Sequence, residues 1–106
     1  HGAEISVRQL AERIAEGQAP AILDVRERHE YEITRLPGSH LIPLRELPER
    51  LRELDPHADL VVLCHHGTRS LRAAELLRAA GFERARSLAG GIDAWAAEVD
   101  PEMARY

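Results

Sequence analysis

The chain contains one cysteine, and the residues that follow it are of the types that support a thiol nucleophile. Cys64 closes an apolar run and opens the sequence Cys-His-His-Gly-Thr-Arg-Ser at positions 64–70. If this segment is a tight loop that leads into a helix, its free backbone N–H groups point inward and the helix dipole adds partial positive charge. Gly67 can adopt the positive φ that such a loop needs, and Arg69 supplies a fixed cation. These features all favour the thiolate, the reactive form of cysteine.

The alternative is a structural cysteine, because free cysteine is among the most often buried residue types. A structural cysteine, however, has no need for glycine, arginine and hydroxyl side chains in the loop behind it. We therefore expect Cys64 to be the catalytic nucleophile. The residues expected to bind its substrate are His65, His66, Gly67, Thr68, Arg69 and Ser70.

Short apolar runs alternate with amphipathic stretches along the rest of the chain. Runs bounded by turn residues predict buried strands at 21–25, 40–43, 60–64 and 86–88. Helices are expected from Ser6 to about 17, at 27–35, 47–54, 68–80 and 91–99. This alternation predicts a single α/β domain with a mostly parallel sheet and helices on both faces. Ligands of such sheets bind at the carboxyl ends of the strands, where Cys64 is placed.

Two helix ends have specific sequence signals. Ser6 and Gln9 have the spacing of a capping box at the start of the first helix. Gly81 and Phe82 fit a helix end in which Phe82 folds back towards Leu77.

Composition excludes several classes of protein. The chain has 106 residues, and we expect one domain at 4–106, with 1–3 an added or disordered terminus. The net charge is -4 despite 14 arginines, which argues against nonspecific nucleic-acid binding. One cysteine excludes an internal disulfide, and the adjacent rings of His65 and His66 cannot easily share an ion, so neither a metal nor another cofactor is expected. No leader or long apolar segment is visible, so we expect a cytoplasmic protein without a membrane span.

Four segments make the chain similar to the single-domain rhodaneses, sulfurtransferases that carry sulfur as a cysteine persulfide. They are residues 23–27, 36–44, 62–70 and 88–95, in the order that the family has them. Residues 99–106 also resemble the tail of rhodanese modules that work beside E1-like adenylyltransferases. The resemblance implies one rhodanese-like domain with a five-stranded sheet.

The resemblance also implies a two-step reaction. The Cys64 thiolate takes the outer sulfur of a small anionic donor such as thiosulfate, and an acceptor then removes it. The acceptor is cyanide in vitro, and a thiol or a small sulfur-carrier protein in the cell, with an adenylyltransferase as a further partner. The loop amides stabilise the persulfide and Arg69 holds the anionic end of the substrate. Some thiosulfate-using relatives have a basic residue in the stretch where this chain has Glu30, which argues against thiosulfate as the physiological donor.

Asp24 and Arg26 stand at the end of another predicted strand, close to the same edge of the sheet. Paired charges at strand ends are commonly structural, so we expect a salt bridge that supports the site rather than a contact with substrate.

Three other functions stay open at this point. Phosphatases and arsenate reductases of related fold also use a loop cysteine, but the phosphatase loop is Cys-x5-Arg, whereas Cys64 and Arg69 form Cys-x4-Arg. The shorter ring is expected to fit one sulfur and not a phosphoryl group, and the second cysteine that many of these enzymes use is missing. A noncatalytic rhodanese-like binding module is the third alternative, although such modules usually lose the cysteine.

Overall fold

The computed structural model describes residues 2–106. Its strands are β1 (Glu4–Ile5), β2 (Ala21–Asp24), β3 (His40–Leu41), β4 (Leu60–Leu63) and β5 (Ala85–Leu88). Its α-helices are α1 (Val7–Ala15), α2 (Arg28–Ile33), α3 (Thr68–Ala79) and α4 (Gly91–Glu98), and two short 3-10 helices are η1 (Leu44–Glu49) and η2 (Leu51–Glu53). No helix in this described part of the chain is both long and apolar enough to cross a membrane.

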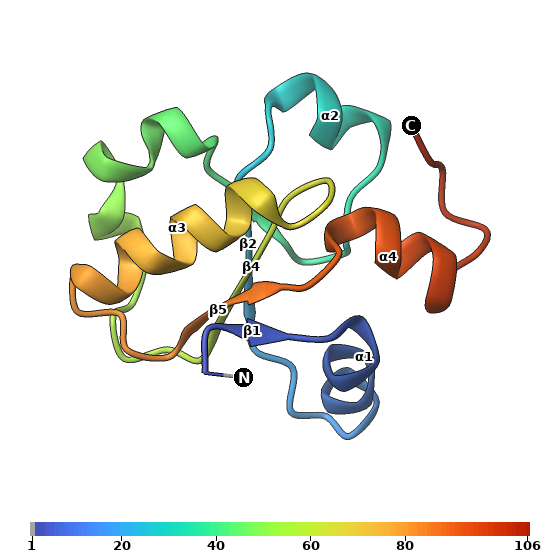
Figure 1. Ribbon diagram of the computed structural model, residues 1–106, viewed down its shortest axis with the longest axis horizontal. Coiled ribbons are helices and arrows are strands. Elements are labelled where there is room, and N and C mark those ends of the chain that lie inside the picture. Colours follow the sequence, from blue (N-terminus) through green and yellow to red (C-terminus); the bar gives the residue numbers. More distant parts are fainter. Residues whose placement is uncertain (1) are drawn as a thin grey trace.

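The five strands form one sheet in the order β1-β5-β4-β2-β3, and every neighbouring pair is parallel. β4 is central: Leu63 lies opposite Asp24 of β2, and Val62 lies opposite Ser87 of β5. Because the strands are parallel, their carboxyl ends share one edge of the sheet. The predicted α/β fold with a five-stranded parallel sheet is confirmed, and the loop after β4 lies at that edge (Figure 1).

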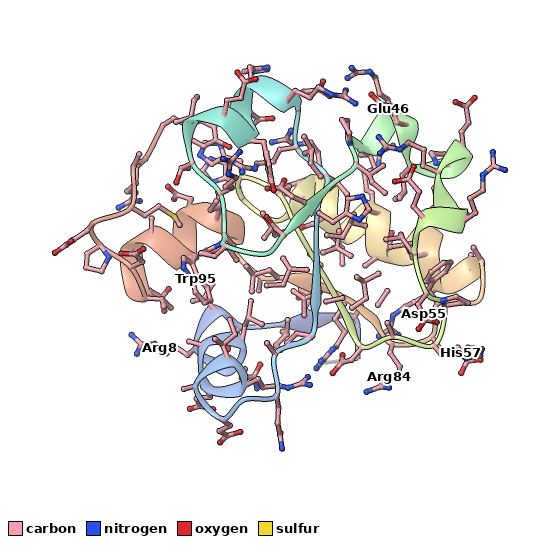
Figure 2. The ribbon with its side chains drawn as sticks, turned by 180° about the vertical axis from the view of Figure 1, so that it is seen from behind. Arg8, Glu46, Asp55, His57, Arg84 and Trp95 are labelled. Carbon is pink, nitrogen blue, oxygen red and sulfur yellow. The ribbon has the colours of Figure 1, made fainter. Side chains whose placement is uncertain are left out.

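Side chains of β4 alternate between two hydrophobic cores, one on each face of the sheet. Leu60 and Val62 pack into the core with α3, whereas Val61 and Leu63 pack into the core with α1 and α4. Figure 1 shows α3 on one side of the sheet and α1 and α4 on the other, as predicted. Trp95 completes the second core from the side of α4 that faces α1 (Figure 2).

The segment 47–54 differs from the prediction of one amphipathic helix and forms η1 and η2 instead. Pro48 lies inside η1, where it has no N–H to donate to the carbonyl of Leu44, four residues earlier, and its ring crowds that carbonyl. The expected apolar stripe is retained, since Leu47, Leu51 and Leu54 all pack against the α3 core.

Both predicted helix ends are confirmed. Ser6 and Gln9 form the reciprocal capping box of α1. At the end of α3, Gly81 has a φ of 100° and the amide of Phe82 donates to the carbonyl of Leu77 at 2.9 Å.

The edge strand β1 was not among the four strands that the sequence analysis placed at specific residues. β1 has only two residues, too few for a periodic signal, and the amide of Ser87 donates to the carbonyl of Ala3 at 2.8 Å. Ala3 thus takes part in the backbone hydrogen bonding of the sheet, while His1 lies outside the described residues, and the domain bounds of 4–106 stay a prediction.

Candidate active site

Cys64 follows β4 directly, and its side chain lies inside the loop that connects β4 to α3. The residue is 1% exposed. The amide of Gly67 donates to its Sγ at 3.1 Å and the amide of Ser70 at 3.3 Å. Two backbone dipoles therefore point at the sulfur, where they stabilise negative charge. We call residues 64–70 the Cys64 loop.

Two glycines allow the Cys64 loop to close against the start of α4. Gly67 has a φ of 108°, in the left-handed region, and a Cβ there would lie 3.2 Å from the amide nitrogen of Gly90. Gly91 has a φ of 63°, and its Cβ would lie 2.4 Å from the carbonyl oxygen of His65. The amide of Ile92 donates to the carbonyl of Cys64 at 2.8 Å, so the first turn of α4 holds the loop backbone.

A pair of buried hydroxyl groups lies on the sheet side of the sulfur. The Oγ of Ser70 is 3.4 Å from Sγ of Cys64 and 2.7 Å from Oγ of Ser87, and both serines are fully buried. Ser70 belongs to the predicted site, whereas Ser87 in β5 was not identified from the sequence. Its role depends on the register between β4 and β5, which no local motif indicates.

The guanidinium of Arg69 is bound to the carboxylate of Glu30 in α2. Its Nη1 and Nη2 donate to Oε1 and Oε2 of Glu30 at 2.7 and 3.0 Å. These bonds lower the pKa of Glu30 from 4.5 to about 2, despite the burial that opposes ionisation. Arg69 was expected to hold an anionic substrate directly, but in the structure its charge is matched by Glu30.

Asp24 and Arg26 form a completely buried ion pair at the end of β2. Nη2 of Arg26 donates to Oδ2 of Asp24 at 2.7 Å, and both side chains have 0% exposure. Arg26 also donates to the carbonyls of Glu30 at 3.3 Å and Thr34 at 2.7 Å, so it anchors α2 to the sheet. The expected salt bridge is therefore present and closed to solvent, while its supporting role in the site stays a prediction.

Tyr106 reaches the same group of charges from the end of the described chain. Its hydroxyl accepts from Nη1 of Arg26 at 2.8 Å and donates to Oε2 of Glu30 at 3.0 Å. Its ring stacks on that of His65, with centroids 3.9 Å apart and planes inclined by 12°. No role was predicted for Tyr106, and the only signal was the resemblance of residues 99–106 to the tail of a family segment.

The remaining predicted loop residues lie towards solvent. His65 is half-buried and burial lowers its pKa below the ordinary 6.5, whereas His66 and Thr68 are exposed. The rings of His65 and His66 lie 3.9 Å apart, and no group of three potential metal ligands occurs among residues 2–106.

Together these features define an α/β domain with a buried cysteine thiol at the carboxyl edge of a parallel sheet. The sulfur accepts from two backbone amides, and the charge of Arg69 in the same loop is matched by Glu30. Residues 6–98 match the rhodanese-like domain family, and the chain belongs to that family.

Individual relatives agree with this assignment. The chain is 38% identical over 111 residues to the adenylyltransferase and sulfurtransferase MOCS3-2 of Zea mays, covering 98% of this chain and 23% of that protein. It is 33% identical to the putative sulfur carrier protein YrkF of Bacillus subtilis, covering 92% of this chain and 52% of the relative. The chain thus spans about a quarter of the length of the adenylyltransferase and sulfurtransferase relatives.

Solved structures of similar length share the fold. A rhodanese-related protein from Thermoplasma volcanium has a TM-score of 0.84 and 34% identity, with 92% of this chain and 93% of that one covered. The human single-domain sulfurtransferase TSTD1 has a TM-score of 0.82 and 28% identity, with 92% and 98% covered. The chain is thus similar to a single-domain sulfurtransferase and to one part of longer sulfurtransferase and sulfur-carrier proteins. These similarities support sulfur transfer as the general activity.

Proposed function

We propose that this chain is a sulfurtransferase that carries sulfane sulfur as a persulfide on Cys64. The observation that carries the proposal is the pair of amides, from Gly67 and Ser70, that donate to the Cys64 sulfur. In this proposal the same donors stabilise the thiolate before transfer, and the loop amides stabilise the persulfide after it, whose negative charge lies on the outer sulfur. The Cys64 thiol in turn donates to the Oγ of Ser70 at 3.4 Å.

The reaction is a pair of displacements at sulfur. With thiosulfate as donor, the Cys64 thiolate attacks the outer sulfur, a new S–S bond forms, and sulfite leaves with the electrons of the old one. An acceptor nucleophile then attacks the outer sulfur of the persulfide, and Cys64 leaves as thiolate. No second cysteine is required, in keeping with the single cysteine of the chain.

Arg69 supports the loop in this proposal more than it binds the donor. Its two terminal nitrogens are engaged by Glu30, so attraction of an anionic donor must come largely from loop amides and the remaining N–H groups. This arrangement weakens the case for thiosulfate as the donor in the cell, although it is a suitable probe in vitro.

The names of the relatives suggest the partners. Adenylyltransferase and sulfurtransferase proteins and a putative sulfur carrier protein share this domain. We propose that the acceptor is a small sulfur-carrier protein, with an adenylyltransferase as a further partner. We also propose a reducing compartment such as the cytoplasm, because the reaction needs Cys64 as a free thiol.

The test is direct measurement of the persulfide. Wild-type protein is incubated with thiosulfate and its intact mass is measured; one added sulfur atom is expected, and none in Cys64→Ser. Cyanide should then remove the sulfur as thiocyanate. An unmodified wild-type protein after thiosulfate and after a small-molecule persulfide contradicts the proposal. Cys64-dependent release of phosphate from an aryl phosphate favours the phosphatase alternative instead.

A further inference from the structure

We infer that Tyr106 is a positioning residue of the sulfur-transfer site, which it organises by holding Glu30, and through Glu30 the Arg69 side chain of the Cys64 loop. The inference rests on the proposed function and assigns a role in it to the segment 100–106. This segment lies beyond residues 6–98, which match the family.

The Tyr106 hydroxyl has a donor on one side and an acceptor on the other. Nη1 of Arg26 donates to it at 2.8 Å, and it donates to Oε2 of Glu30 at 3.0 Å. Arg26 is itself fixed, because it is fully buried and bound to Asp24. The hydroxyl therefore links a rigid ion pair in the sheet to the carboxylate that binds the loop.

All four hydrogen bonds to the Glu30 carboxylate come from groups that define its orientation. Oε1 accepts from the amide of Glu27 at 2.9 Å and from Nη1 of Arg69 at 2.7 Å. Oε2 accepts from Nη2 of Arg69 at 3.0 Å and from Tyr106. Loss of the tyrosine hydroxyl frees one side of Oε2, so the carboxylate can rotate and the Arg69 fork can loosen with it.

The Tyr106 ring makes a second, independent contact with the loop. It stacks on His65, the residue after Cys64, with centroids 3.9 Å apart. The ring centroid of His66 also lies 3.9 Å from that of His65, so the rings of Tyr106, His65 and His66 form a cluster at the exposed side of the loop. Tyr106 thus contacts the Cys64 loop twice: through His65 directly, and through Glu30 and Arg69. It touches neither the sulfur nor, in our proposal, the substrate, and its effect passes through loop geometry.

Three variants separate positioning from simple stability. Tyr106→Phe keeps the ring and removes the hydroxyl, and Tyr106→Ala removes both. Tyr31→Phe is the matched control, because the Tyr31 hydroxyl likewise donates to one group, the carbonyl of Ser39 at 2.8 Å, and accepts from another, its Oγ at 3.2 Å. That pair lies outside the Cys64 loop.

Two rates are measured for each protein: single-turnover formation of the persulfide from thiosulfate, and alkylation of Cys64 by iodoacetamide. Misplacement of about 1 Å can cost roughly a hundredfold in rate, so a partial loosening of the loop should slow persulfide formation about fivefold in Tyr106→Phe and at least about tenfold in Tyr106→Ala. The rate of Cys64 alkylation should fall in the same order, less in Tyr106→Phe and more in Tyr106→Ala. Tyr31→Phe should match wild type in both rates, while its melting temperature falls about as much as that of Tyr106→Phe.

The outcomes are distinguishable. If wild type forms persulfide and both Tyr106 variants form it at the wild-type rate, the inference is wrong and the proposed function stands. If Tyr31→Phe slows the reaction as much as Tyr106→Phe, the effect is one of general stability and the inference is again wrong. If wild type forms no persulfide, the proposed function fails, and the alkylation rates alone decide whether Tyr106 positions the loop.

Discussion

The carboxylate of Glu30 links the Cys64 loop to α2 and to the end of the described chain. It receives hydrogen bonds from Arg69, Tyr106 and the amide of Glu27, and the residue is 8% exposed. A carboxylate in such surroundings prefers to stay ionised, which is why its pKa falls from 4.5 to about 2, with Arg69 as the main cause. At the residue scale, the charges of Arg26 and Arg69 are therefore matched by those of Asp24 and Glu30. The sulfur of Cys64 has separate donors, the amides of its own loop.

This pKa predicts how stability depends on pH. Because the folded-state pKa of Glu30 lies below its ordinary value, its ionisation stabilises the fold fully above about pH 4.5, and this contribution is lost as the pH falls towards 2. Glu30→Gln should therefore lower the free energy of unfolding by roughly 2–3 kcal/mol at pH 7, as expected for hydrogen bonds to a charged group. The difference from wild type should shrink progressively between pH 4.5 and pH 2.

Urea unfolding at a series of pH values measures this effect. Glu32→Gln is the control, because Glu32 is an exposed glutamate in the same helix. It should change the free energy of unfolding by less than about 0.5 kcal/mol. A Glu30→Gln deficit that stays constant from pH 7 to pH 3 would show that the ionised carboxylate is not the source of the stability.

At the scale of elements, the start of α4 sets the shape of the Cys64 loop. The amides of Ile92 and Asp93 donate to the carbonyls of Cys64 and His65 at 2.8 and 3.0 Å. The helix can approach so closely only because Gly91 has no side chain: its Cβ would lie 2.5 Å from the carbonyl oxygen of Cys64. The Cys64 loop can be recognised in the sequence, but α4, which completes it, comes from another part of the chain.

Gly91→Ala tests the requirement for close approach. Two costs are expected: strain from a φ of 63°, and displacement of the loop carbonyls. Gly17→Ala is a matched control, because Gly17 has a φ of 76° with no atom within 4 Å of its Cβ position. Gly17→Ala should cost about 1–2 kcal/mol and leave the rate of persulfide formation unchanged. Gly91→Ala should lower the free energy of unfolding by more than Gly17→Ala and slow persulfide formation at least about tenfold. Equal effects of the two variants on stability and on rate would refute the requirement for close approach.

Features that depend on neighbouring residues could be predicted from the sequence, whereas contacts between residues far apart in the chain could not. The capping box of Ser6 and Gln9 and the end of α3 at Gly81 are local, and neighbouring residues determine both of them. The Cys64 loop could be recognised from its own residues, although the start of α4 completes its shape. The partners of that loop are not local: Glu30 is 39 positions from Arg69, and Tyr106 is 80 positions from Arg26. No periodicity or motif indicates such pairs, because they depend on how α2 and the tail pack against the sheet. The helix expected at 47–54 failed for a different reason, since Pro48 overrode an apolar pattern that was otherwise helical.

At the scale of the whole molecule, one sheet separates two hydrophobic cores that share its central strand. β4 belongs to both, with Val62 in the α3 core and Leu63 in the core of α1 and α4. A small domain whose central strand is shared in this way is expected to show a single cooperative transition. The active-site loop begins at the end of that strand, so its geometry depends on both cores together.

Leu77→Ala tests this cooperativity, with Trp95 as the reporter. Leu77 is fully buried in the α3 core, whereas Trp95, the only tryptophan, lies in the core on the other face. Truncation of a buried leucine costs about 2–5 kcal/mol. If the faces are coupled, the urea midpoint measured by Trp95 fluorescence should fall by the same amount as the midpoint measured by far-ultraviolet circular dichroism. Independent faces would leave the fluorescence midpoint near that of wild type while the dichroism midpoint moved. Leu63→Ala is the control, because Leu63 lies in the same core as Trp95, and it should lower both midpoints together. If the two midpoints separate in Leu77→Ala but not in Leu63→Ala, the sheet is the boundary between two unfolding units.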